Sequence, residues 1–250
     1  MPRPADPEQT LDLPPGYTLV ALRELGDAFA HACEIATEAG AATLVWVRRY
    51  DLVEFAVVLE PDEKLVSARR AFFAGMNAVA DAIAAHCPPE REVKFVWPDT
   101  ILFDEGLLGG ARLGWPSDCA EDEIPAWLVF GVILRAADMA HIEEVQAASG
   151  VALLSEGFEM VETNAIIESF CRHLMTAFDR WSEQGFDPIA RDYLDRLPAR
   201  KAGERRAIDG NGDLLVRIQA GKGSPERTGF LDALARVAWY DPQARGPKFG

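Results

Sequence analysis

Four arginines that could bind an anion lie on or beside segments with the composition of strands. They are Arg48, Arg49, Arg112 and Arg135. A guanidinium group binds a carboxylate or phosphate through two parallel N–H donors, so these residues point to a small acidic ligand. The alternative is that they pair with acidic side chains on the surface. Because successive strand residues face opposite sides, Arg48 and Arg49 cannot both face one site.

Lys94 lies close to the most distinctive motif of the chain, Trp97-Pro98-Asp99. Its flexible stem could carry the ammonium group to a reacting carboxylate, which makes it the candidate catalytic residue; the alternative is a solvated lysine at a strand edge. Trp97 could stack on a ligand ring or pack in the core. Asp99 could hold Mg²⁺ or cap a turn.

Three glycines occur within apolar strand-like segments, namely Gly109, Gly110 and Gly131. A missing side chain lets a ligand approach the backbone closely, so these residues are candidates for a binding site. A bulged or crowded position within a sheet would also require glycine. Both interpretations stay open at the level of the sequence.

The composition restricts the partners of the protein. The chain has 250 residues, of which 40 are acidic and 25 basic, giving a formal net charge of −15. Such a surface repels a phosphate backbone or an anionic bilayer, so we expect neither nucleic acid nor a membrane as a partner. No apolar run approaches the roughly 20 residues needed to span a bilayer, and no leader is recognisable, so we expect a cytoplasmic location. The four cysteines are far apart, and no metal site is predicted.

Periodicity and turn residues predict a mixed order of strands and helices. The predicted strands are Tyr17–Leu22, Ala42–Arg48, Val53–Leu59, Val93–Trp97, Ile101–Asp104, Leu107–Leu113, Trp127–Leu134, Leu214–Ile218 and Arg236–Tyr240. The predicted helices are Asp27–Thr37, one long helix from Leu65 to Ile83, Ile166–Trp181 and a last one from Asp187 to Leu197. Asp209-Gly210-Asn211-Gly212 predicts a tight hairpin turn.

This order predicts an α+β fold rather than strict βαβ alternation. We expect a mixed, largely antiparallel sheet flanked by helices, followed by a small C-terminal β-rich appendage. Residues 1–16 contain five prolines and are predicted to be a disordered lead-in. Residues 17–198 would form the main domain and residues 199–250 a small C-terminal domain or tail.

Three segments resemble the biotin/lipoate protein ligase family. Val96-Trp97-Pro98-Asp99-Thr100 and Leu107-Leu108-Gly109-Gly110-Ala111 match, in type and separation, its Lys-Trp-Pro-Asn-Asp motif and the Lys-Leu-Ala-Gly-containing strand that follows. Trp127–Arg135 is similar to its Trp-Val-Val-Ile-Gly-Ile-Gly-Ile-Asn strand. The resemblance covers about residues 20–200. It implies a fold like that of biotin protein ligases and class II synthetases.

The chain departs from the family at positions that carry chemistry. Val96 and Leu107 replace the two motif lysines, and Arg135 replaces the asparagine associated with the metal. The long glycine- and arginine-rich loop that closes over biotin and the adenylate is reduced to Arg49–Leu52. Leu25-Gly26-Asp27 lies where the family has Ser-Thr-Asn.

The resemblance implies that the protein binds biotin, lipoate, a fatty acyl group or another small carboxylic acid, or its adenylate. ATP with Mg²⁺ would activate the acid, and a lysine of a carrier protein would accept the acyl group. The alternative is a catalytically inactive ligand-binding or interaction module that kept the fold. Sequence does not choose between these readings or predict the oligomeric state.

Overall fold

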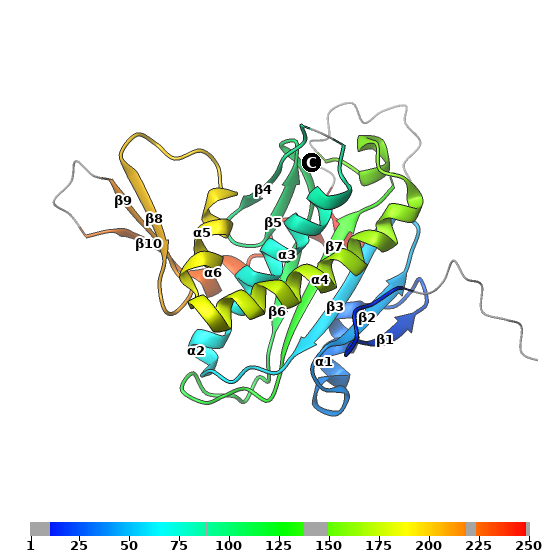
Figure 1. Ribbon diagram of the computed structural model, residues 1–250, viewed down its shortest axis with the longest axis horizontal. Coiled ribbons are helices and arrows are strands. Elements are labelled where there is room, and N and C mark those ends of the chain that lie inside the picture. Colours follow the sequence, from blue (N-terminus) through cyan, green and yellow to red (C-terminus); the bar gives the residue numbers. More distant parts are fainter. Residues whose placement is uncertain (1–10, 89, 138–149, 219–223, 249–250) are drawn as a thin grey trace, which may run out of the picture.

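The computed structural model describes residues 11–88, 90–137, 150–218 and 224–248. Its centre is a seven-stranded mixed sheet in the order β1-β2-β3-β7-β6-β5-β4 (Figure 1), in which β1 and β2 are parallel and the other neighbours antiparallel. The strands are β1 Thr18–Leu22, β2 Thr43–Arg48, β3 Leu52–Leu59, β4 Val93–Val96, β5 Thr100–Phe103, β6 Gly106–Gly114 and β7 Leu128–Arg135. The α+β fold predicted from the sequence is confirmed.

Helices cover both faces of this sheet. They are α1 Ala28–Ala39, α2 Leu65–Ala68, α3 Ala71–His86, α4 Met160–Gln184, α5 Asp187–Asp195 and α6 Phe230–Leu234, with a 3-10 turn at Leu153–Glu156. Helix α4 crosses in front of the sheet in Figure 1, beside α3. We call the side of the sheet covered by α3 and α4 the α4 face, and the side covered by α1 the α1 face.

Large aromatic side chains fill the α4 face. The rings of Phe130 on β7 and Phe170 on α4 stack with centroids 5.9 Å apart. Helix α3 lies so close to the sheet that a Cβ on Gly75 would be 2.6 Å from the Phe130 ring. Dispersion and the removal of apolar surface from water hold this layer together.

Small side chains make the contact on the α1 face. Ala28, Ala32 and Ala36 recur along one side of α1 and pack, fully buried, on valines of β2 and β3. Asp27 caps the helix by accepting a hydrogen bond from the Ala30 amide at 2.9 Å. The Glu54 carboxylate on β3 accepts a second one from the Ala28 amide, also at 2.9 Å. Two carboxylates therefore fix the start of α1 over the sheet.

The C-terminal region returns to the main core. Its strands β8 Glu204–Ile208, β9 Leu214–Ile218 and β10 Glu226–Thr228 form a small antiparallel sheet, to one side in Figure 1, with the predicted turn at 209–212 between β8 and β9. Phe230 on α6 is fully buried against Phe72 and Phe73 of α3. The chain then continues to β11 Tyr240–Asp241 and β12 Gly246–Pro247, which pair with each other next to β6 and β7.

Two predicted elements are wrong. The helix expected from Leu65 to Ile83 is interrupted between α2 and α3, where the Nε of Arg70 donates to the carbonyl of Ser67. The second is the strand expected at Arg236–Tyr240, of which only Tyr240 is in a strand. The residues before it form turns, because Val237 has a left-handed φ of 40° that an extended strand does not allow.

Residues 1–10 of the predicted lead-in lie outside the described part. No helix within the described residues is long and apolar enough to cross a membrane.

Candidate ligand-binding site

Alternate residues of the central strands bring several predicted site residues to the α1 face. Two rows run across β3, β7 and β6: Ala56–Gly131–Arg112 and, two residues along, Glu54–Ile133–Gly110. Residues paired directly across a sheet point to the same side, so each row shares one face. Arg112, Gly110 and Gly131, three of the candidate residues, therefore lie together on this face.

Arg112 is a half-buried cation surrounded by aromatic rings. Its guanidinium carbon lies 3.9 Å from the centre of the Tyr240 ring, 5.8 Å from that of Phe29 and 5.9 Å from that of Trp239. Within the described part of the chain it makes neither a hydrogen bond nor an ion pair. The ring faces stabilise the positive charge, but they are not conventional hydrogen-bond acceptors for its five N–H groups. Its N–H groups therefore have no acceptor among the described residues.

The three predicted glycines are all crowded by the protein itself; Gly110 and Gly131 lie on the α1 face, whereas Gly109 pairs with Leu134 and faces the α4 side. A Cβ on Gly110 would lie 2.4 Å from the Trp239 indole, and one on Gly131 would lie 2.7 Å from the Phe29 ring. A Cβ on Gly109 would lie 2.0 Å from the carbonyl oxygen of Ile133. These contacts favour the alternative interpretation from the sequence, in which crowding within the sheet requires glycine.

Asp99 is buried beneath the C-terminal region. Its Oδ2 accepts a hydrogen bond from the Trp239 indole N–H at 3.1 Å, and its Oδ1 one from the Thr100 hydroxyl at 3.2 Å. Burial raises the pKa of Asp99 to about 6, and these two hydrogen bonds oppose the rise. Asp99 therefore holds Trp239 in place rather than capping an exposed turn.

A second buried carboxylate lies near the start of α1. Burial raises the pKa of Glu54; Asp27 adds to the rise, whereas the Ala28 amide and the charges of Arg49 and Arg245 oppose it. Arg49 binds Asp51 through two N–H groups at 2.9 and 2.6 Å and lies 3.8 Å from Glu54. Its charge is therefore largely engaged within the protein.

Three predicted site residues lie elsewhere. Arg48 pairs with Val53, whose side chain belongs to the core of the α4 face, so Arg48 points away from Arg112. The Trp97 ring packs against Phe73 and Tyr193 in that same core. Lys94 lies on the edge strand β4 and pairs with Glu92 at 2.9 Å. These positions favour the structural alternative for Trp97 and Lys94, and Arg48 and Arg112 do not form one site.

Arg135 lies on the α1 face but has a structural partner. One of its terminal nitrogens donates to the carbonyls of Pro247 and Lys248, both at 2.9 Å. The residue is nearly fully buried, so this cation fastens the C-terminal segment to the sheet.

A Mg²⁺ site does not fit these residues. The described residues contain no group of three or more histidine, cysteine, aspartate or glutamate side chains that could hold a metal ion. On the α1 face, Asp99 is bonded to Trp239 and Glu54 to Ala28, and Arg135 adds a positive charge. Mg²⁺ prefers carboxylate and water oxygens in an octahedral arrangement, which this cationic surface does not offer.

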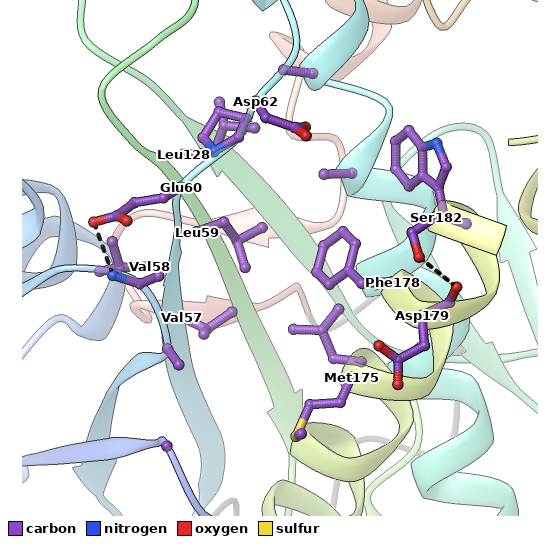
Figure 2. Close-up of a pocket in the computed structure, with 18 of the residues that line it drawn as sticks. Val57, Val58, Leu59, Glu60, Asp62, Leu128, Met175, Phe178, Asp179 and Ser182 are labelled. Atoms are coloured by element: carbon purple, nitrogen blue, oxygen red, sulfur yellow. Dashed lines mark hydrogen bonds between the residues drawn. The ribbon is translucent and has the colours of Figure 1, made fainter. Parts of the chain in front are cut away.

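A sizeable hollow of the described structure lies on the α4 face (Figure 2). It measures about 850 Å³ and lies between the end of β3 and the second half of α4, where Leu59, Met175 and Phe178 give it an apolar lining. Glu60 and Asp179 are among the carboxylates that border it, and the lining includes no lysine or arginine. None of the predicted site residues lines it. A carboxylic acid would be repelled there, so the α1 face is the better candidate.

Four residues that complete the α1 face were not among the candidates predicted from the sequence. Glu54 could have been noticed, because it is the one acid within the apolar segment Leu52–Leu59. Phe29, Trp239 and Tyr240 gave no such signal. They meet Arg112 only through the folding of segments far apart in the sequence.

Comparison with known proteins decides the family. The model of the biotin/lipoate A/B protein ligase family matches residues 13–195, nearly three quarters of the chain. The chain belongs to this family. The match includes the seven-stranded sheet, the helices α1 to α5 and Arg112, and it ends before the small sheet of the C-terminal region.

Similar proteins carry the names of biotin ligases. A biotin–[acetyl-CoA-carboxylase] ligase of Paracoccus denitrificans is 27% identical over 231 residues, covering 86% of this chain and 91% of that protein. A biotin protein ligase-like protein of unknown function from Silicibacter has 24% identity and a TM-score of 0.73, covering 91% of this chain and 99% of the other. Biotin protein ligase from Aquifex aeolicus, in complex with biotin and ATP, has 13% identity and a TM-score of 0.58, covering 84% and 94%. The two structures confirm the fold.

Proposed function

We propose that this protein binds biotin, or a small carboxylic acid or acyl-adenylate like it, on the α1 face. The anionic group would lie against Arg112. The observation that carries this proposal is the half-buried guanidinium of Arg112, which has aromatic neighbours but no acceptor within the described residues. Hydrogen bonds to a charged group contribute about 1.5–3 kcal/mol, enough to select an acid over its neutral analogue.

The relatives support the choice of ligand. The Paracoccus protein is named as a ligase of biotin and acetyl-CoA carboxylase, which makes biotin the first candidate acid and a carrier protein the candidate acceptor. The Aquifex structure holds biotin and ATP, which makes ATP the candidate activating nucleotide. Arg112 and the flanking rings would bind and orient the acid, because a bidentate arginine fixes a planar carboxylate.

A second function is favoured by a different observation. Phe29 and Trp239 fill the space over Gly131 and Gly110, and Leu107 packs beside Trp239 where the family has a lysine. A protein that kept the fold as an inactive binding or interaction module would show the same features.

One experiment separates the two functions. Calorimetry and thermal shift would be measured with biotin, lipoate, octanoate and a non-hydrolysable biotinyl-adenylate analogue, followed by release of pyrophosphate from ATP. Binding of the analogue with pyrophosphate release would support a ligase. Binding without pyrophosphate would support a ligand-binding module, and no binding by any of the four would reject the proposed site.

A further inference from the structure

The end of the chain forms a hairpin across the α1 face. We call Trp239–Lys248 the C-terminal hairpin; its strands β11 and β12 pair antiparallel. The two ends differ in burial. Trp239 at its base is buried, as are Gly246 and Pro247, whereas residues 242–245 at its tip are exposed.

This hairpin covers the cation of the proposed site. Trp239 lies over Gly110, and the Tyr240 ring lies 3.9 Å from the Arg112 guanidinium carbon. A ligand that binds Arg112 from this side must therefore displace Tyr240. The position of the hairpin decides whether the N–H donors of Arg112 are accessible.

The base of the hairpin is firmly attached. Trp239 donates to the buried Asp99, and the buried Arg135 donates to the carbonyls of Pro247 and Lys248. These hydrogen bonds involve charged groups that are shielded from water, and such bonds are stronger than those between neutral, exposed groups. Trp239 also packs in a small apolar cluster with Leu52 and Ile133.

The tip reaches the start of α1 through an exposed side chain. Arg245 donates to the carbonyl of Leu25 at 3.2 Å and to that of Gly26 at 3.0 Å. Exposed hydrogen bonds of this kind compete with water and contribute little each. A hollow of about 380 Å³ borders the tip, with Arg49, Tyr50 and Arg245 among its lining residues. The tip therefore has both a weak attachment and free space beside it.

We propose that the C-terminal hairpin is a movable wall of the Arg112 site, with Arg245 as its latch and Tyr240 as the side chain that controls access. The base stays in place through Asp99 and Arg135, while the tip swings away from Leu25 and Gly26. The backbone of Tyr240 stays paired with Pro247, but its side chain then has room to rotate away from Arg112, and an acid can reach the guanidinium. This inference rests on the proposed function, because it concerns access to the same cation.

The latch is tested first without any ligand. Arg245→Gln removes the two hydrogen bonds, and Arg236→Gln is the matched control, since Arg236 is an exposed arginine of the same region with the same change in charge. We expect amide hydrogen exchange at the tip, residues 241–245, to become about tenfold faster in Arg245→Gln, to stay unchanged at Lys248 in the base, and to stay unchanged throughout in the control. Equal exchange rates in the wild type and both variants would contradict the proposal that Arg245 holds the tip in place.

Access is then measured by stopped-flow fluorescence with the biotinyl-adenylate analogue. Arg245→Gln and Tyr240→Ala should both raise the association rate, by roughly three- to tenfold, relative to the wild type and Arg236→Gln. A slower or unchanged association rate in both variants would contradict the proposal that the hairpin controls access to Arg112. Failure of the proposed function looks different, since no form of the protein, including Tyr240→Ala, would then bind the analogue.

Discussion

At the scale of single residues, Asp99 couples the stability of the protein to pH. Burial raises its pKa from 3.8 to about 6. Because the folded pKa lies above the unfolded one, the contribution of Asp99 to folding is fully present below about pH 4 and is lost as pH rises through about 6. The difference corresponds to about 3 kcal/mol.

Asp99→Asn removes this titration while keeping one acceptor for Trp239. We expect the free energy of unfolding of the variant to change less between pH 4 and 6 than that of the wild type, and to exceed it above pH 6. Urea unfolding at several pH values measures this, with the exposed Asp179→Asn as control. Parallel profiles of unfolding free energy against pH for the wild type and Asp99→Asn would show that Asp99 has the same pKa in the folded and the unfolded protein, which would contradict the prediction.

Gly110 shows how tightly the α1 face is packed. Gly110→Ala would place a methyl group 2.4 Å from the Trp239 indole. Although alanine is favoured over glycine within a strand, the clash should dominate and lower the free energy of unfolding by about 1–3 kcal/mol. Gly210→Ala is the control, because no atom lies within 4 Å of the Cβ that it adds. Equal stability of the two variants would mean that Trp239 does not lie over Gly110.

At the scale of elements, the start of α1 depends on its cap. Asp27→Ala removes the acceptor of the Ala30 amide and should lower the free energy of unfolding by about 1 kcal/mol. Asp27→Asn should restore most of this, since asparagine caps a helix nearly as well. A loss in Asp27→Asn as large as that in Asp27→Ala would instead assign the role to the charge of Asp27.

Elements formed by neighbouring residues could be predicted from the sequence. The hairpin of β2 and β3 follows from two apolar runs and a short turn, and α1 from its apolar spacing behind Asp27. The site could be predicted in part, because strand alternation and the family motifs brought Arg112 and Gly131 to one face. The C-terminal hairpin that covers the site could not be predicted. Trp239 meets Asp99 across 140 residues and Arg245 meets Leu25 across 220, and no local pattern encodes such pairs.

At the scale of the whole molecule, the two faces of the sheet differ in charge and in contents. The α4 face carries the aromatic core and the large hollow bordered by carboxylates. The α1 face carries Arg112, Arg49 and Arg135 within a chain of net charge −15. An anionic ligand should therefore choose the α1 face, where Arg112 has no acidic partner among the described residues.

Calorimetric titration with the biotinyl-adenylate analogue tests this central claim most directly. It would compare the wild type with Arg112→Gln and with Arg48→Gln, which removes an arginine from the opposite face. We expect Arg112→Gln to weaken binding by at least tenfold, about 1.4 kcal/mol, and Arg48→Gln to leave it unchanged. Equal affinity of wild type and Arg112→Gln would contradict the assignment of the ligand to Arg112 and to the α1 face.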